Sequence, residues 1–516
     1  MLKRVLLANR GEIALRVQRT CRELGIETVA VYSDADRNAL HVRNADAAVH
    51  IGPGPATESY LVIEKIIEAA RQTGADAIHP GYGFLSENAA FADACEAAGI
   101  IFIGPPASAM QALGDKVSAR RLMEEAGVPV VPGANEIDAD DLATATREAE
   151  RIGLPLLVKA AAGGGGRGIR LVESMDELGA AMRASGREAE TSFGDATIFL
   201  EKYVEPARHI EVQLIADNHG NVRTYGEREC SVQRRHQKLL EESPSVAVTP
   251  EIRAQLCEAA ANAAKSAGYR NAGTVEFLMD ASGQFYFLEM NARLQVEHPV
   301  TELVYGVDLV AQQLAVAAGE AFEGGDESPQ PVGWSIECRI NGENPFQNFA
   351  PSLGVIEHVE APLGPGTRFD SMLFDGLDVP IYYDSMLGKL IVWAETREDA
   401  VKRMRRALND LVIAGIQTNI PFHLALLDHP DFISGAISTS WLEANFEMSE
   451  MPADDPRQRD ALVVAALAAE MARANGHDAV AAAPISGWQR SSRATAVHLR
   501  TRDGGLRGWH RGIASS

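Results

Sequence analysis

Two segments in the middle of the chain each contain two strand-like runs joined by a short polar turn. The first is HIEVQLIADNHGNVRTYGE, residues 209–227, and the second is GTVEFLMDASGQFYFLEMN, residues 273–291. Adjacent strand-like runs separated by Asn, Asp, Gly or Ser are typical of β-hairpins. The middle of the chain is therefore expected to be α+β.

The chain before residue 110 follows another pattern, in which strand-like and helix-like runs alternate. Residues 5–8 and 27–32 read as strands, and residues 12–24 between them have the apolar spacing of a helix. Further strands are expected at 76–79 and 100–103. This alternation predicts a parallel sheet covered by helices. The NRGE turn after the first strand lacks GxGxxG, so no nicotinamide or flavin site is expected there.

The composition of the chain indicates which kinds of partner and which cellular compartment to expect. The 516 residues are enough for several domains, and the net charge of −23 argues against broad nucleic-acid binding. No apolar segment approaches the roughly 20 residues that span a bilayer, and the first apolar run is too short for a signal peptide. The five cysteines form no CxxC pair, which is typical of reduced thiols in a cytoplasmic protein.

A run of glycines lies in KAAAGGGGRGIR, residues 159–170. It formally matches GxGxxG, but residues 154–159 and 168–173 on either side are both strand-like, whereas a dinucleotide fingerprint needs a helix after the glycines. No GK[ST] follows, so a Walker loop is also excluded. A glycine hairpin is either an exposed flexible turn or a loop that folds over a triphosphate. Lys159 and Arg167 favour the phosphate interpretation.

The second hairpin carries a pair of carboxylates. With its turn centred on residues 281–282, Glu276 pairs with Phe287, and Glu276, Glu289 and Asn291 share one face. The two glutamates are then diagonal neighbours that suit Mg²⁺. Alternatively, the strand faces solvent and carries ordinary charges, but its apolar neighbours argue for burial and hence for a cation.

Three further groups of charged residues each have a structural and a functional interpretation. Arg293, Glu297 and His298, which follow the hairpin, are either a loop of mutual salt bridges or an anion clamp with a general base. The basic run QRRHQK, residues 233–238, is either a solvated patch or an anion site. Periodicity alone predicts a solvent-facing Arg339.

At these residues the sequence resembles the biotin carboxylase subunits of acyl-CoA and pyruvate carboxylases, within the ATP-grasp superfamily. The resemblance covers roughly residues 2–446 in family order, and the combination of motifs is specific although each alone is weak. The matching stretches are ANRGEIALRV (8–17), HPGYGFLSEN (79–88), GDK (114–116), KAAAGGGGRGIR (159–170), EKYVE (201–205), RHIEVQ (208–213), ERECSVQRRHQKLLEESP (227–244), FLEMNARLQVEHPVTE (287–302), ECRINGEN (337–344) and YYDSMLGKL (382–390).

The resemblance implies an α/β plus α+β fold with several parts. Residues 1–113 would form a Rossmann-like N-terminal domain, and residues 114–330 an ATP-grasp domain with a mobile lid at about 130–204 that carries the glycine hairpin. Residues 331–446 would form the C-terminal biotin carboxylase domain. Residues 447–516 would be a helical or irregular extension that either docks a partner or is a disordered remnant.

The resemblance also implies a site for ATP with Mg²⁺ or Mn²⁺. The residues expected to bind phosphates are Lys116, Lys159, Gly163, Gly164, Gly165 and Gly166. The residues expected around adenine and the rest of the nucleotide are Glu201, Lys202, Tyr203, Val204, His209, Gln233 and His236. The residues expected to bind the metal are Glu276, Glu289 and Asn291.

The implied reaction phosphorylates bicarbonate to carboxyphosphate, which delivers CO₂ to N1′ of biotin. Bicarbonate would be held by Lys238, Arg293, Gln295 and Val296. Glu297 would deprotonate it, and Arg339 would stabilise the enolate form of biotin. Carboxyphosphate hydrolyses in open water, so a closing lid is chemically required.

The implied partners follow from what the sequence contains. No Met-Lys-Met biotin-attachment motif is present, so biotin is expected to arrive on a carrier protein that is another chain, with a carboxyltransferase as further partner. A cytoplasmic homodimer is expected. The alternatives are the biotin carboxylase component of a pyruvate carboxylase, another ATP-grasp ligase that makes a carbamoyl or acyl phosphate, and a non-catalytic ATP-binding regulator.

Overall fold

The structure is a computed structural model that describes residues 2–160, 170–193, 197–322 and 328–448. This part of the chain is a mixed α/β protein with the three-domain architecture expected from the sequence. None of its helices has the length and apolar character needed to cross a membrane.

The N-terminal part contains the predicted parallel sheet. Its strand order is β3-β2-β1-β4-β5, and the pairs β1–β2, β2–β3, β1–β4 and β4–β5 are all parallel. The strands expected at 5–8, 27–32, 76–79 and 100–103 are all present. The bounds are β1 Arg4–Leu7, α1 Gly11–Glu23, β2 Glu27–Ser33, α2 Leu40–Arg43, β3 Ala47–Gly52, α3 Ile63–Thr73, β4 Ala77–His79, α4 Ala89–Ala97 and β5 Ile101–Phe102.

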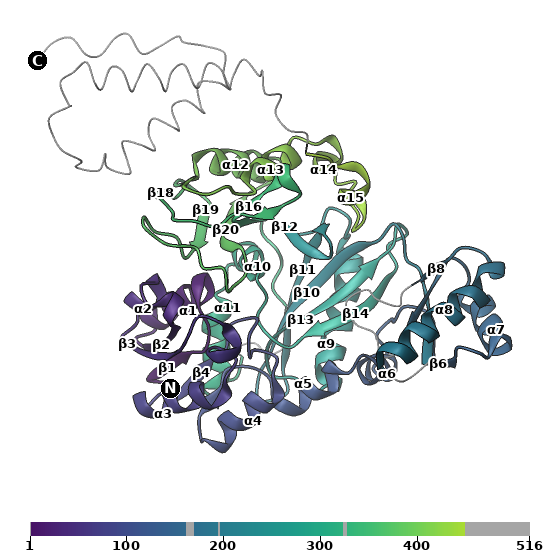
Figure 1. Cartoon of the computed structure of the whole chain (residues 1–516), viewed down its shortest axis with the longest axis horizontal. Helices are drawn as coiled ribbons and strands as arrows, with labels where there is room; N and C mark the ends of the chain where they lie inside the picture. Colours follow the sequence, from purple (N-terminus) through teal and green to yellow (C-terminus); the bar gives the residue numbers. More distant parts are fainter. Residues whose placement is uncertain (1, 161–169, 194–196, 323–327, 449–516) are drawn as a thin grey trace, which may run out of the picture.

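An eight-stranded antiparallel sheet forms the centre of the molecule, in the order β14-β13-β10-β11-β12-β15-β20-β19 (Figure 1). One hydrophobic core lies between its first strands and α9, and another lies between its last strands and helices α12 and α13. The bounds are β10 Arg208–Ala216, β11 Val222–Arg234, β12 Gln237–Ser243, α9 Pro250–Ser266, β13 Asn271–Met279, β14 Phe285–Asn291, α10 His298–Tyr305, β15 Trp334–Asn341, β19 Thr367–Ser371, β20 Met386–Ala394, α12 Arg397–Asp410 and α13 Ile420–Leu427.

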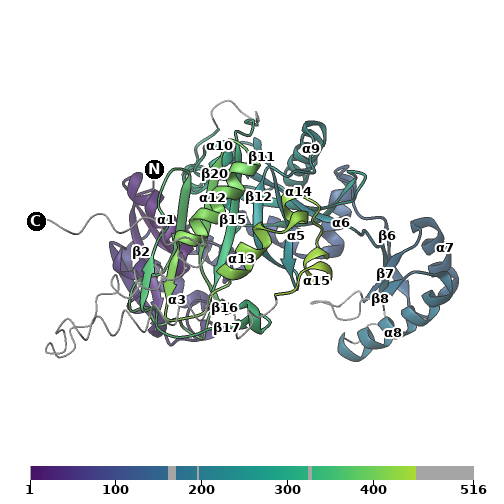
Figure 2. The ribbon, with the colours of Figure 1, turned by 90° about the horizontal axis from the view of Figure 1, so that it is seen from above.

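A smaller sheet with the order β6-β9-β7-β8 stands apart from the central sheet, together with helices α7 and α8 (Figures 1 and 2). Strands β7 and β8 pair antiparallel, with Leu156 opposite Val172, which confirms the predicted hairpin around the glycines. The glycines 163–166 themselves lie outside the described residues. The bounds are β6 Gly133–Asp138, α7 Leu142–Ile152, β7 Leu156–Ala160, β8 Arg170–Val172, α8 Met175–Phe193 and β9 Thr197–Lys202.

Both predicted hairpins of the central sheet are present, but the predicted register of the second one is wrong. Glu276 lies opposite Glu289, not opposite Phe287. The turn is longer than expected, because Asp280 accepts backbone hydrogen bonds within it and Gly283 adopts a positive φ of 86°. A bulge between Glu276 and Phe277 shifts the pairing further. The two glutamates are therefore direct cross-strand neighbours instead of diagonal ones.

Candidate active site

A group of charged side chains forms a continuous set of ion pairs over the central sheet, and we call it the central charged cluster. It combines residues from β10, β11, β12, β13 and β15 with the segment between β14 and α10. Its members are Glu211, Arg228, Lys238, Glu276, Glu297 and Arg339.

Lys238 is the central cation of this cluster. Its Nζ lies 2.5 Å from Glu211, 3.0 Å from Glu276 and 2.6 Å from Glu297. Burial alone would lower the pKa of Lys238, but the surrounding carboxylates, Glu211 above all, hold it well above its usual range. The side chain is therefore a permanent positive charge. The QRRHQK run is thus not simply a solvated patch, because Lys238 is only 12% exposed.

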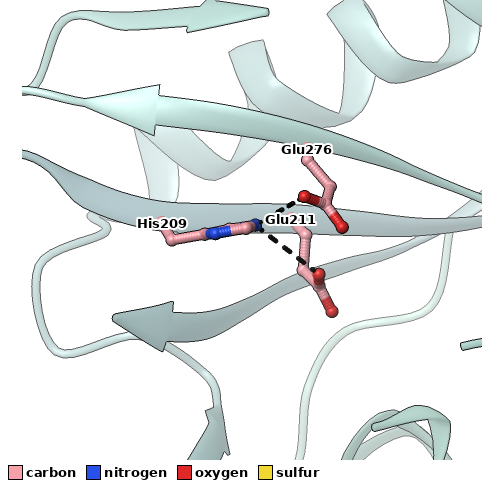
Figure 3. Close-up of side chains that lie close together, drawn as sticks. All are labelled: His209, Glu211 and Glu276. Atoms are coloured by element: carbon pink, nitrogen blue, oxygen red, sulfur yellow. Dashed lines mark ion pairs between the residues drawn. The ribbon is translucent and has the colours of Figure 1, made fainter. Parts of the chain in front are cut away.

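Glu276 is surrounded by donors on its strand's buried face. His209 Nε2 lies 2.8 Å from Oε2, and Gln295 and Asn291 donate to Oε1 at 2.7 and 2.8 Å. Figure 3 shows His209 and Glu211 side by side with Glu276. Burial raises the pKa of Glu276, but Lys238 and His209 outweigh it and hold the pKa well below its ordinary value. The carboxylate is therefore ionised, which is the state that binds a cation.

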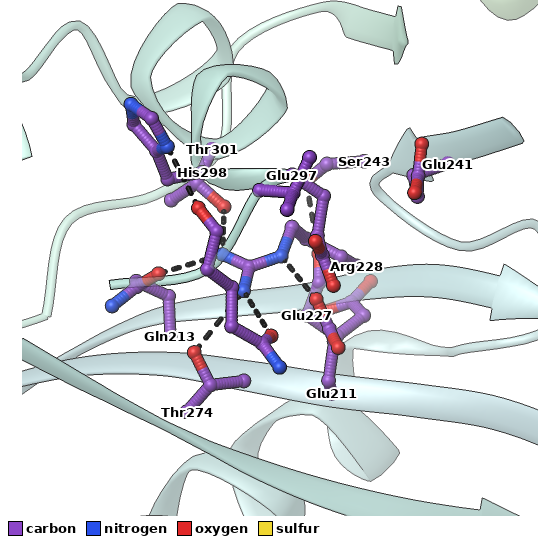
Figure 4. A network of polar contacts seen from close by, with 12 residues as sticks. Glu211, Gln213, Glu227, Arg228, Glu241, Ser243, Thr274, Glu297, His298 and Thr301 are labelled. Atoms are coloured by element: carbon purple, nitrogen blue, oxygen red, sulfur yellow. Dashed lines mark hydrogen bonds and ion pairs between the residues drawn. The ribbon is translucent and has the colours of Figure 1, made fainter. Parts of the chain in front are cut away.

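Arg228 connects strands β10 and β13 of the sheet to the segment that carries Glu297 (Figure 4). Its guanidinium is fully buried and donates to Glu211 at 2.5 Å and to Thr301 at 2.9 Å. It also donates to Gln295 at 3.2 Å. Neither Glu211 nor Arg228 was assigned a role from the sequence. The signal for Glu211 was its alternation with apolar residues on β10, where a buried charge demands a partner.

Glu297 lies at the N-terminus of α10 between two cations. Its Oε1 accepts from Lys238 at 2.6 Å and its Oε2 from Arg339 at 2.9 Å. Burial opposes its charge, but Lys238 and Arg339 hold its pKa well below the ordinary value. An unprotonated carboxylate is the state that a general base requires, and its two cationic neighbours are groups that can hold an anion.

Arg339 is not the solvent-facing residue that periodicity predicts. Its side chain is 17% exposed and also donates to Glu241 at 2.6 Å. Burial raises the pKa of Glu241 to about 7. The structure therefore provides a guanidinium fixed by two carboxylates, Glu241 and Glu297, at the edge of the cluster.

Arg293 and His298 do not share salt bridges with Glu297. Arg293 instead donates to Glu87 at 3.0 Å and to Asn291 at 3.1 Å. His298 is fully buried, and its Nδ1 lies 2.8 Å from the carbonyl oxygen of Gln295. The loop of mutual salt bridges considered from the sequence is therefore wrong.

The residues expected to bind metal fit that role chemically. Glu276 and Glu289 are cross-strand neighbours, and the Asn291 amide lies between them, 2.8 Å from Glu276 and 3.5 Å from Glu289. Two carboxylates with an amide oxygen are suitable ligands for Mg²⁺. The oxygen of the Asn291 amide accepts from Arg293 in this structure, so presenting it to a metal would require the amide to turn and the contact with Arg293 to be given up.

The residues expected to bind the nucleotide fall into two groups. His209 and Gln233 lie beside the cluster, and 2.7 Å separates Nδ1 of His209 from Nε2 of Gln233. His236, in contrast, is exposed at the turn between β11 and β12. Lys159 and Glu201 form a 2.9 Å ion pair on the smaller sheet. Among the described residues, no hydrogen bond joins that pair to the cluster.

The other expected nucleotide residues lie near the same small sheet. Lys202 donates to the carbonyl oxygens of Gly153 and Leu154, and Tyr203 and Val204 follow β9 directly. Lys116 is the first residue of helix α6, Lys116–Glu125.

Family models match three successive stretches of the chain. Residues 1–110 match the biotin carboxylase N-terminal domain, residues 115–324 the ATP-binding domain of the carbamoyl-phosphate synthase L chain, and residues 337–444 the biotin carboxylase C-terminal domain.

Individual relatives agree with these models. "Biotin carboxylase 1" of Bacillus subtilis is 52% identical over 86% of this chain and 98% of its own length. "Propionyl-CoA carboxylase alpha chain" of Ruegeria pomeroyi is 47% identical over 92% of this chain and 72% of its own length. The biotin carboxylase domain dimer of Hydrogenobacter thermophilus 2-oxoglutarate carboxylase was solved with MgADP, ADP and bicarbonate. It superposes with a TM-score of 0.79 at 48% identity, covering 87% of this chain and all of that one.

Proposed function

The chain belongs to the biotin carboxylase family of ATP-dependent ligases, and we propose that the central charged cluster is where it activates bicarbonate for the carboxylation of biotin. The observation that carries this proposal is the position of Glu297, an ionised carboxylate held between Lys238 and Arg339. Such a group combines a base with two cations that hold an anionic substrate.

Bicarbonate would bind against Lys238, Arg293 and the segment of Gln295 and Val296. Lys238 then exchanges part of its contact with Glu297 for the substrate oxygen, and Glu297 takes the bicarbonate proton. The resulting oxyanion attacks the γ-phosphorus of ATP, the bond to the bridging oxygen breaks, and ADP leaves. Glu276, Glu289 and Asn291 would hold Mg²⁺, which would stabilise the negative charge of the phosphates.

Carboxyphosphate breaks into CO₂ and phosphate next to the ureido ring of biotin. The phosphate takes the N1′ proton, and N1′ attacks CO₂. Negative charge develops on the ureido oxygen as N1′ becomes nucleophilic, and Arg339 is the guanidinium placed to stabilise it. Its two carboxylate partners, Glu241 and Glu297, fix its orientation before biotin arrives.

The nucleotide would lie between the central sheet and the smaller one. We propose that Lys116, Lys159 and the glycines 163–166 hold phosphates, that residues 201–204 hold adenine, and that His209, Gln233 and His236 complete the site. The division into domains at 1–113, 114–330 with its lid, and 331–446 belongs to the same proposal, as does closure of the lid over ATP.

The partners would be a biotin carrier protein on another chain, a carboxyltransferase and a second copy of this chain. The similar proteins are named for different overall carboxylases, so we infer that the final acceptor is chosen by the carboxyltransferase. Five free cysteines, four of them buried, support a cytoplasmic location.

The test is ATP hydrolysis measured with bicarbonate, with and without free biotin. We expect bicarbonate-dependent hydrolysis that biotin stimulates and that Glu297→Gln reduces by about 10²–10⁴-fold. A rate of hydrolysis that biotin leaves unchanged but an amine acceptor increases would identify another ATP-grasp ligase. Nucleotide binding without any hydrolysis would identify a regulator.

A further inference from the structure

Two of the motifs in this sequence carry no residue with a role in the proposed reaction, yet they meet beside the site. ANRGEIALRV places Glu12 in the first turn of α1, and YYDSMLGKL places Lys389 in β20. Both side chains are buried, with Lys389 at 0% and Glu12 at 4% exposure. Buried charges of this kind are costly, so their contacts need an explanation.

Lys389 touches each of the three parts of the molecule. Its Nζ lies 3.3 Å from Glu12 Oε1 in the N-terminal part and sits over the ring of Tyr82, 5.7 Å from its centroid. The same Nζ donates to the backbone carbonyl oxygen of Val296 at 2.8 Å. Lys389 itself lies opposite Arg339 on the neighbouring strand β15.

The contact with Val296 fixes the peptide group that leads directly into Glu297. Neighbouring atoms of the same segment are held from other directions, by His298 on the carbonyl of Gln295 and by Arg228 on the side chains of Gln295 and Thr301. Lys389 is the residue that donates a hydrogen bond to the carbonyl oxygen of the 296–297 peptide. Its loss would leave that peptide plane free to rotate, and with it the carboxylate that must face bicarbonate.

We propose that Lys389 is a positioning residue that orients the 296–297 peptide and thereby the base Glu297, with Glu12 as its buried counter-charge. This inference rests on the proposed function of the site and adds to it a residue that touches none of the reacting atoms. A displacement of about 1 Å at a reacting group costs on the order of 10²-fold in rate.

The alternative is a purely structural role, in which Lys389 only neutralises the buried charge of Glu12. The two roles predict different effects of substitutions. The single variant Lys389→Met cannot separate the two, because it also leaves Glu12 buried without its cation. The double variant Glu12→Gln with Lys389→Met removes both charges together. Gln suits this position, because it keeps the size and shape of the Glu12 side chain without its charge.

The experiment compares the full-length wild type, Glu12→Gln, and the double variant by melting temperature and by bicarbonate-dependent ATP hydrolysis. We expect kcat/KM for bicarbonate to fall about 10–100-fold in the double variant. The KM for ATP should stay within about twofold, since no nucleotide contact is removed. Glu12→Gln keeps the bond from Lys389 to Val296 and should lose several-fold less than the double variant.

Lys389→Arg provides the conservative comparison, because it keeps a charged donor. It should retain at least about fivefold more kcat/KM for bicarbonate than Lys389→Met, which corresponds to a partly kept charged hydrogen bond. A double variant within twofold of wild type would overturn the inference, as would equal losses in the Arg and Met variants. A wild type without bicarbonate-dependent hydrolysis would instead overturn the proposed function.

Discussion

Arg228 has no exposed surface, and its guanidinium donates to side chains from two other strands, β10 and β13, and from α10. Burial would lower its pKa, but Glu211 and Glu297 raise it, so it remains charged. We predict that Arg228→Met lowers the free energy of unfolding by about 3–5 kcal/mol, because Glu211 loses a buried partner. Denaturant-induced unfolding measures this loss.

The matched control is Arg121→Met on helix α6. Arg121 is 77% exposed and lies 3.9 Å from Glu125, so its removal should change stability by less than about 0.5 kcal/mol. If the two variants were equally stable, Arg228 would not be the buried support described above.

His41 gives a prediction for the dependence of stability on pH. The ring is fully buried, and burial lowers its pKa from 6.5 to about 4. Between those values the unfolded chain binds a proton that the folded chain does not, so acidification through this window favours unfolding. Replacing His41 with Leu should make the free energy of unfolding less steep against pH by about 1.4 kcal/mol per unit between pH 6 and 5. An unchanged slope would contradict burial of a neutral ring.

At the scale of elements, the sequence predicted the hairpins but not their fine register. Alternation and turn residues located β13 and β14, and the apolar flanks correctly placed Glu276 in a buried setting. The burial expected for Glu289 is wrong, because its side chain is exposed on β14. The predicted register is wrong for two reasons, a longer turn held by hydrogen bonds to Asp280 and a bulge next to Phe277. Both depend on local hydrogen bonds, which the alternation of apolar and polar residues does not reveal. The predicted face was still right, since Glu276 and Glu289 became closer neighbours.

The residues in and around the site of Glu297 were predictable only in part. Lys238 and Arg339 came from the family resemblance, whereas Glu211, Arg228 and Lys389 were not assigned. Their partners lie 27, 73 and 93 positions away in the sequence. Such contacts depend on how strands are ordered in the sheet, which spacing along one strand does not determine.

The turn between β11 and β12 offers a prediction about strain. Arg235 and His236 have φ of 50° and 61°, a left-handed conformation that costs non-glycine residues about 1–2 kcal/mol each. A two-residue turn with both φ values positive favours Asn-Gly. Arg235→Asn with His236→Gly should therefore raise the melting temperature by about 1–4 °C. It should also raise the KM for ATP about 3–10-fold, because a proposed nucleotide contact is lost.

Arg235→Asn alone separates the two effects. It should stabilise the turn by roughly half as much, because Asn tolerates the left-handed conformation, and leave the KM for ATP unchanged. If the KM rose equally in the single and double variants, the shape of the turn and not His236 would govern nucleotide binding.

At the scale of the whole molecule, the central sheet crosses the boundary expected near residue 330. Strand β12 precedes that boundary and β15 follows it, yet the two pair from Leu240 opposite Cys338 to Ser243 opposite Ser335. Leu240 also belongs to the same hydrophobic core as α12 and α13. Glu297 and its ion-pair partner Arg339 likewise lie on opposite sides of the boundary. The middle and C-terminal parts therefore share one sheet, one core and one site.

This continuity predicts the behaviour of a truncated chain. A chain ending at residue 330 would lack β15, β20 and β19, exposing the edge of β12 and the apolar side chains of Val232 and Leu240. Exposed edges with apolar surface promote aggregation, so we expect no monomeric, cooperatively melting product in size-exclusion chromatography and calorimetry.

A chain ending at residue 448 retains every described contact and should melt within about 2 °C of the full chain. A stable monomer of residues 1–330 would show that the shared sheet is two independent units, and Arg339 would then be brought to Glu297 by docking instead of by folding.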